Sequence, residues 1–279
     1  GRHLIKQLQP HSHLITPHRS DLDLENPAAT QAFIRQHQPD AIIHLAAKVG
    51  GIAANVADPV GFYRDNEQIN HHLIYAALAE KVPYLMNLGS SCMYPANREQ
   101  LTEEDLLDGK LEPTNEGYAL AKITATKLCR YISQQYGFQY KTIIPCNLYG
   151  PYDKFDAQRA HLIPAIIRKI HHAKLNESPK ITIWGNGEAR REFMHVDDLT
   201  NFITLALKKF DELPPWINVG LGTDHTVNEY YQTVADVLEY PAQFDHDLTK
   251  PAGMLRKRLN IDKARSLGWA PRISLQHGI

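Results

Sequence analysis

Cysteine is scarce in this chain, and the charge is nearly balanced. The three cysteines, Cys92, Cys129 and Cys146, have neither the close spacing of a metal site nor the even number that a disulfide framework needs. A formal net charge of -1 gives no electrostatic reason to expect nucleic acid or an anionic membrane as a partner. The scarcity of cysteine favours a protein of a reducing compartment, so we expect a cytoplasmic location.

Long apolar runs are absent as well. No hydrophobic stretch approaches the roughly 20 residues that cross a bilayer, and no signal-peptide pattern opens the sequence. Hydrophobic residues make up 43% of the 279 residues and charged residues 22%, as in ordinary globular proteins. A chain of this length can form one large domain or two modest ones.

Both ends of the sequence read as the middle of a structural element. Residues 1–8 have a helical pattern, and residues 274–279 look like the start of another helix. A glycine-rich turn that holds a pyrophosphate normally follows a first strand and opens a helix. Gly1 stands where such a turn would end. We therefore expect a fragment in which the N-terminal strand and the Gly-rich turn are missing.

Short β-branched runs alternate with longer helical patterns over the first 150 residues. The expected strands are 13–16, 40–47, 84–89 and 140–146, and the expected helices are 27–36, 60–80 and 115–136. This alternation predicts an α/β fold with a doubly wound parallel sheet and helices on both faces. The carboxyl ends of parallel strands meet at one edge, so we expect the site there.

After Gly150 the pattern changes, because loops lengthen and proline and glycine become frequent. Helices are expected at 161–173, 196–207 and 227–238, with strands at 181–184 and 216–219. We predict a dinucleotide-binding domain formed by residues 1–150 plus about 192–212. A smaller α/β substrate domain would comprise 151–191 and 213–279.

The most informative pattern joins a serine at a strand end to a Tyr-x-x-x-Lys helix. Tyr118 and Lys122 are four residues apart and share one helix face. A nearby ammonium is expected to lower the pKa of the phenol from about 10, and Ser90 can hydrogen-bond the same substrate oxygen. The pattern predicts a carbonyl–alcohol redox centre, although such a pair also occurs by chance on many helices.

Two features bear on a cofactor. Arg19 follows the first expected strand, where an acidic residue would bind the ribose hydroxyls of NAD, so an arginine favours the 2′-phosphate of NADP. A solvated loop arginine is the alternative. Ala46 and Ala47 end their strand with side chains small enough for a cofactor to pass close by.

Five segments, taken in order, resemble the GDP-L-fucose synthase family of the extended short-chain dehydrogenases/reductases. They are 45–52, 88–95, 111–122, 147–151 and 191–198. The resemblance implies a Rossmann-type fold, NADPH as cofactor, a GDP-sugar substrate and a homodimer formed through helices around 68–78 and 121–133. Ser91-Cys92 stands where a dehydratase would carry Asp-Glu, which argues against dehydration.

The resemblance implies two reactions at one centre. GDP-4-keto-6-deoxy-D-mannose would be epimerised at C3 and C5, and NADPH would then reduce its C4 ketone to give GDP-L-fucose. Cys92 and His161 would be the acid and base of the epimerisation, while Tyr118 protonates the oxygen with the help of Ser90 and Lys122. Another nucleotide-sugar epimerase that recycles NAD, or a truncated non-catalytic relative, remains the alternative.

The same resemblance assigns residues to each ligand. The expected cofactor-binding residues are Gly1, Arg19, Ala46, Ala47, Lys48, Leu88, Gly89, Ser90, Ser91, Tyr118, Lys122, Pro145, Cys146, Asn147, Leu148 and His161. The expected substrate-binding residues are Asn147, Lys169, Trp184, Arg191 and Lys250. Arg191 would bind the diphosphate, because a guanidinium matches two phosphate oxygens. Asn66 resembles the helix asparagine of the superfamily, or is a solvated polar residue.

Overall fold

A parallel sheet forms the centre of the larger part of the chain, as expected from the alternating pattern. The computed structural model describes residues 1–156, 160–178, 180–249 and 256–279. Its four-stranded sheet consists of β1 (Ala41–His44), β2 (Tyr84–Leu88), β4 (Gln139–Pro145) and β9 (Trp216–Val219). The strand order is β1-β2-β4-β9 and every pair is parallel, which confirms the predicted α/β class.

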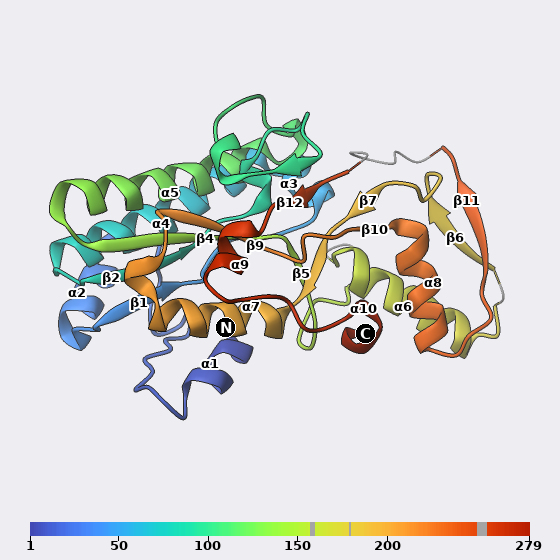
Figure 1. The fold of residues 1–279 in the computed structure, drawn as a ribbon, viewed down its shortest axis with the longest axis horizontal. Helices are drawn as coiled ribbons and strands as arrows, with labels where there is room; N and C mark the ends of the chain where they lie inside the picture. The colour runs from blue at the N-terminus through green and yellow to red at the C-terminus, as the bar shows by residue number, and fades with distance from the viewer. Residues whose placement is uncertain (157–159, 179, 250–255) are drawn as a thin grey trace.

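Helices cover both faces of this sheet (Figure 1). One face carries α2 (Pro27–His37), α4 (Pro59–Ala79) and α5 (Glu116–Tyr136), and the other carries α1 (Arg2–Leu8) and α7 (Val196–Lys208). Successive strand residues point to opposite faces, so Leu85 of β2 joins the core under α4 and α5, whereas Met86 joins the core under α7. The predicted doubly wound arrangement is therefore confirmed.

A smaller part has its own hydrophobic core, on the right in Figure 1. It contains α6 (Leu162–Leu175), α8 (Val227–Val237), β6 (Lys180–Trp184) and β11 (Gln243–Asp247), and β6 pairs in parallel with β11. Its buried residues form a cluster separate from those of the large sheet. The predicted domain bounds stay a prediction. However, β9 follows residue 213 and still lies in the large sheet.

The remaining helices and strands are short. The helices are α3 (Ile52–Ala57), α9 (Asp262–Ser266), α10 (Leu275–Gly278), η1 (Ser91–Met93), η2 (Glu103–Asp105), η3 (Pro113–Asn115) and η4 (Phe210–Glu212). The strands are β3 (Gln100–Leu101), β5 (Asn147–Tyr149), β7 (Arg190–Arg191), β8 (Phe193–His195), β10 (His225–Thr226) and β12 (Arg258–Leu259). β12 pairs with β3, so the chain returns to the larger part near its C-terminal end.

One expected strand is wrong. Residues 13–16 form no strand, because β1 pairs with β2 and no strand in the described part of the chain pairs with 13–16. An isolated β-branched run has no backbone hydrogen bonds to hold it extended as a strand. Among the described helices, none is both long and apolar enough to cross a membrane.

Candidate active site

The turn after β2 presents Ser90 and Cys92 at the carboxyl edge of the sheet. The Gly89 N–H donates to the carbonyl of Ile143 at 2.8 Å, which holds the turn onto β4. A Cβ at Gly89 would meet the Met93 sulfur at 3.1 Å and Thr142 at 3.2 Å, so this close approach requires glycine. Ser90 is the N-cap of η1, and its Oγ accepts from the Cys92 N–H at 3.3 Å.

The first turns of α5 bring Tyr118 and Lys122 to the same place. A Cβ at Gly117 would meet the Pro59 carbonyl at 3.0 Å, so glycine lets the start of α5 lie against α4. Tyr118 is hydrogen-bonded to Ser90. The Lys122 Nζ donates to the Leu88 carbonyl at 2.8 Å and lies 6.0 Å from the centre of the Tyr118 ring. The structure therefore assembles Ser90, Cys92, Tyr118 and Lys122 as the sequence predicts.

Burial dominates the electrostatics of this group. It lowers the pKa of Lys122 to about 8, because the ammonium is 3% exposed. Burial and the adjacent Cys92 raise the pKa of Tyr118 well above its usual 10, against the opposing hydrogen bond with Ser90. The expected lowering of the Tyr118 pKa is therefore wrong for this structure, because burial raises it. Tyr118 holds its proton at neutral pH and can act as an acid.

A buried histidine lies near Lys122 at the end of β1. The His44 Nε2 is 2.9 Å from Asn70 Oδ1, and the Asn70 amide donates to the Ala121 carbonyl at 3.0 Å. Burial and then the Lys122 charge lower the pKa of His44 to about 4, so His44 is neutral at pH 7. This chain of contacts ties β1 to α4 and α5. It was not recognised in the sequence, because a lone histidine in a strand gives no such signal.

The turn after β1 is fixed by Asn66 of α4. Its Oδ1 accepts from the Lys48 N–H at 2.9 Å, and its Nδ2 donates to the carbonyls of Lys48 at 3.0 Å and Phe62 at 2.7 Å. Asn66 is fully buried, so it is not a solvated residue. The Lys48 ammonium contacts Asp58 at 2.8 Å and Asp65 at 2.7 Å, so its charge is paired with two carboxylates of the protein.

The remaining expected cofactor residues lie around this edge. Ala46 is exposed and Ala47 is partly buried beyond the end of β1, while Leu88 and Ser91 flank the Gly89 turn. Pro145, Cys146, Asn147 and Leu148 follow along β4 and β5. Gly1 is the N-cap of α1. The Arg19 guanidinium is largely exposed and donates to Glu25 at 2.8 Å, so its role in cofactor binding stays a prediction.

The expected substrate residues lie mainly in the smaller part. The exposed Trp184 ends β6, and Arg191 lies in β7, where burial lowers its pKa. The Lys169 ammonium donates to the Thr182 carbonyl and lies 5.8 Å from the Tyr231 ring centre. Asn147 donates to the Glu192 carbonyl at 3.1 Å.

One expected catalytic residue is not brought to the Ser90–Tyr118 group by any described contact. His161 is the exposed N-cap of α6, and no described hydrogen bond joins it to Cys92 or Tyr118. Its catalytic role stays a prediction. Lys250 lies outside the described residues.

Glu192 is a buried carboxylate for which the sequence predicted no role. Its Oε1 accepts from the N–H groups of Leu221 at 2.6 Å and Gly222 at 2.8 Å, and its Oε2 accepts from the Leu259 N–H at 2.8 Å. Burial raises its pKa to about 7, although the three backbone donors favour the charged form. Glu192 therefore joins the loop after β9 to β12, directly beside Arg191 in the sequence.

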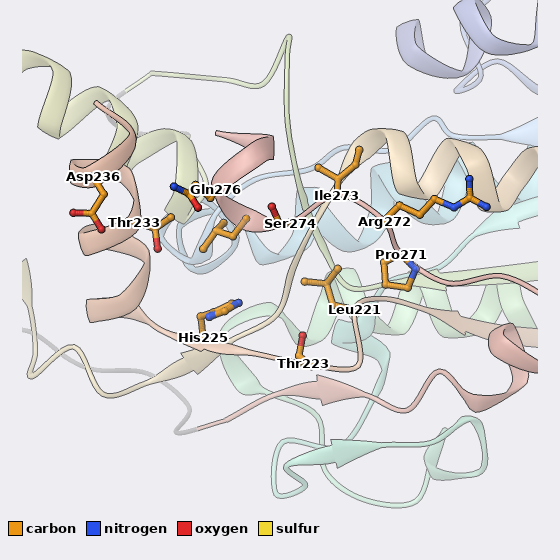
Figure 2. A pocket seen from close by; sticks show the side chains of 11 residues that line it. Leu221, Thr223, His225, Thr233, Asp236, Pro271, Arg272, Ile273, Ser274 and Gln276 are labelled. Atoms are coloured by element: carbon orange, nitrogen blue, oxygen red, sulfur yellow. The ribbon is translucent and has the colours of Figure 1, made fainter. Parts of the chain in front are cut away.

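A separate cavity of about 560 Å³ lies between α8 and the segment before α10 (Figure 2). Its lining includes His225, Thr233 and Arg272. None of the site residues predicted from the sequence lines it. The cavity is therefore distinct from the Ser90–Tyr118 group.

Comparison with known proteins defines the class first. A family model described as the NAD dependent epimerase/dehydratase family matches residues 1–220. The chain belongs to this family. Its fold also matches a GDP-6-OMe-4-keto-L-xylo-heptose reductase from C. jejuni, with a TM-score of 0.93 at 29% identity, covering 100% of this chain and 91% of the other. The MlghC GDP-mannoheptose C4 reductase from Campylobacter jejuni, solved with NADP bound, matches with a TM-score of 0.91 at 28% identity, covering 100% of this chain and 92% of that one.

Within the family, the chain is similar to synthases of GDP-linked deoxy sugars. It is 48% identical over 267 residues to the GDP-L-colitose synthase of Yersinia pseudotuberculosis, covering 95% of this chain and 87% of the relative. It is 47% identical over 267 residues to the GDP-L-fucose synthase of Azorhizobium caulinodans, covering 95% of this chain and 86% of that relative. These identities confirm the resemblance predicted from the five sequence segments.

Proposed function

We propose that this chain is an NADPH-dependent epimerase-reductase that converts GDP-4-keto-6-deoxy-D-mannose to GDP-L-fucose. The observation that carries the proposal is the position of Cys92. Its sulfur lies in the same turn as Ser90 and interacts electrostatically with Tyr118. A reductase needs only the Ser90, Tyr118 and Lys122 group, whereas an added thiol supplies the base that proton abstraction requires.

The residues at the sheet edge fit NADP. Lys122 is a buried ammonium with three N–H donors, yet the described residues supply one acceptor, the Leu88 carbonyl. A ribose hydroxyl would satisfy a second donor. The small, exposed Ala46 beyond the end of β1 would let the cofactor pass close by, and Arg19 would bind its 2′-phosphate. When bound, NADPH supplies the hydride for C4.

Epimerisation follows from the thiol and the protonated phenol. A Cys92 thiolate takes a proton from a carbon beside the C4 ketone, and the electron pair moves to the ketone oxygen as an enolate. Tyr118 donates a hydrogen bond to that oxygen. His161 returns a proton to the carbon from the opposite face, which inverts it. The negative sulfur raises the Tyr118 pKa, so the phenol stays protonated while the base is charged.

Reduction uses the same phenol as a proton donor. Tyr118 gives its proton to the C4 oxygen as the ketone becomes an alcohol, and Ser90 hydrogen-bonds the same oxygen. The Lys122 charge compensates the phenolate that forms. On the substrate side, Arg191 would bind the diphosphate, Trp184 would contact the guanosine, and Asn147, Lys169 and Lys250 would contact the rest of the GDP-sugar.

Oligomeric state and location are further parts of the proposal. Large apolar side chains are exposed on the outer surfaces of α4 and α5, among them Tyr75, Leu120 and Tyr131. Burying these side chains against a second copy of the chain would remove apolar area from water. We therefore propose a homodimer that forms through α4 and α5. We also propose that the protein is located in the cytoplasm.

A second candidate is a synthase for GDP-L-colitose. The observation that favours it is the 48% identity to the Yersinia pseudotuberculosis protein, against 47% for the fucose synthase of Azorhizobium caulinodans. Both candidates use the same phenol and thiol, and the sugars differ at C3, where colitose lacks a hydroxyl. The substrate, rather than the catalytic group, therefore separates the two candidates.

The test compares substrates with the full chain. It is incubated with NADPH and either GDP-4-keto-6-deoxy-D-mannose or its 3-deoxy counterpart, and the products are identified by NMR. We expect NADPH oxidation and GDP-L-fucose from the first substrate, with a higher kcat/KM than for the second. A clear preference for the 3-deoxy substrate would move the assignment to the colitose candidate. Reduction without inversion at C3 or C5 would identify a reductase alone.

A further inference from the structure

Asn115 stands at the N-cap of α5 but does not cap that helix. An asparagine at this position usually turns its side-chain oxygen back to accept an N–H of the first helical turn. Asn115 has φ -138° and ψ 22°, and its side chain makes no capping hydrogen bond. Its amide is therefore directed to something other than the stability of the helix.

The amide contacts the Cys92 sulfur instead. The Asn115 Nδ2 donates to Cys92 Sγ at 3.2 Å, from η3 to η1 across 23 positions of the sequence. The Asn115 Oδ1 is buried and has no hydrogen-bond partner among the described residues. A buried, unpaired carbonyl oxygen is unfavourable for folding, so each such group in a native structure calls for an explanation. The contact of Nδ2 with the sulfur is such an explanation, because it fixes the orientation of the amide and leaves Oδ1 unpaired.

We propose that Asn115 is a positioning residue for epimerisation: its amide N–H holds the Cys92 sulfur toward the substrate and favours the thiolate over the thiol. The inference rests on the proposed function, in which Cys92 is a base. A charged sulfur accepts a stronger hydrogen bond than a neutral thiol, so a fixed donor shifts the equilibrium toward the charged form. An amide does this without adding a second cation near Tyr118, beside which Lys122 already lies.

The titratable groups described around this donor make other contacts. Tyr118 of α5 interacts with Cys92, and the Lys122 ammonium donates to the Leu88 carbonyl. On the other side, Glu112 precedes η3 and accepts from the Thr114 hydroxyl at 3.2 Å. Glu116, the first residue of α5, is exposed. Asn115 is thus a neutral donor to the sulfur.

Alkylation by iodoacetamide tests the inference without any substrate. Cys129 and Cys146 are buried, so the partly exposed Cys92 is the thiol that reacts in the folded chain. Asn115→Ala should slow alkylation of Cys92 at pH 7 about tenfold, because the sulfur loses the donor that stabilises its charged form. Asn115→Asp should slow alkylation further, because a carboxylate repels the thiolate. Alkylation rates that are unchanged in both variants would overturn the inference.

Asn87→Ala is the matched control. Asn87 lies in β2, also has a buried Oδ1 without a described partner, and donates to Thr142 rather than to sulfur. Its alkylation profile should equal that of the unmodified chain. If Asn115→Ala does not fold, as judged by circular dichroism, Asn115→Ser and Asn115→Asp carry the same test.

Exchange of substrate protons provides the functional readout. In ²H₂O at pH 7, Asn115→Ala should incorporate deuterium at C3 and C5 about tenfold more slowly, with KM nearly unchanged and the rate recovering at alkaline pH. A purely structural role would give a loss that does not recover with pH. If the unmodified chain itself exchanges no protons, the proposed function fails, while the alkylation profile still tests the contact.

Discussion

Replacing Lys122 by methionine should abolish reduction and at the same time stabilise the fold at neutral pH. The ammonium is 3% exposed, and burial lowers its pKa from 10.5 to about 8. At about 1.4 kcal/mol per pKa unit, keeping this group charged costs the folded state about 3 kcal/mol. The lost hydrogen bond to the Leu88 carbonyl offsets about 1 kcal/mol of that. Lys122→Met should therefore gain about 2 kcal/mol at pH 7.

The pH dependence identifies the cause of that gain. Below about pH 8, both the folded and the unfolded chain hold the Lys122 proton, so the full cost of burying the charge is present. Between about pH 8 and 10.5 the folded chain releases the proton while the unfolded chain keeps it, and the stability of the unmodified protein rises. The advantage of Lys122→Met should therefore shrink as the pH rises through this window.

Urea unfolding followed by circular dichroism at several values between pH 7 and 9.5 measures both effects. Lys110→Met, at an exposed loop position, is the control and should show no pH-dependent difference from the unmodified chain. Lys122→Met that is less stable than the unmodified protein at pH 7 would refute the reasoning. A stability difference that does not change with pH would refute it equally.

Three further variants test the other parts of the site. Cys92→Ser should slow deuterium exchange at C3 and C5 by at least about 100-fold while an already epimerised ketone is still reduced; equal loss of both steps would count against a separate base. Arg19→Glu should raise the KM for NADPH about tenfold and leave that for NADH nearly unchanged; equal changes would exclude a 2′-phosphate contact. Glu192→Gln should lower the free energy of unfolding by about 2 kcal/mol, because its amide N–H₂ faces backbone N–H donors; unchanged urea denaturation would show that the carboxylate is no clamp.

The sequence predicted the strands and helices that have an apolar periodicity of their own. The long helices α4 and α5 and the strands β2 and β4 lie within about a residue of their expected positions, because each carries its own apolar periodicity. Residues 13–16 have strand-like composition but no pairing partner, and composition alone cannot report a partner. The two-residue strands such as β3 and β12 carry too few side chains to form a pattern.

The site was predictable where spacing within one element determines geometry. Tyr118 and Lys122 share a helix face, so their proximity follows from a four-residue interval. The contact of Asn115 with Cys92 joins two short helices, and the clamp made by Glu192 joins residues up to 67 positions apart. Such contacts depend on how elements pack. The direction of the Tyr118 pKa shift was wrong for the same reason, because burial is set by tertiary structure.

The central claim is that one group of side chains carries out both epimerisation and reduction, and solvent deuterium tests it most directly. The unmodified chain is incubated in ²H₂O with GDP-4-keto-6-deoxy-D-mannose and NADPH, and the product is examined by NMR. We predict GDP-L-fucose with deuterium at both C3 and C5 and none transferred from solvent to C4. A reduced product that keeps protium at C3 and C5 would contradict the account.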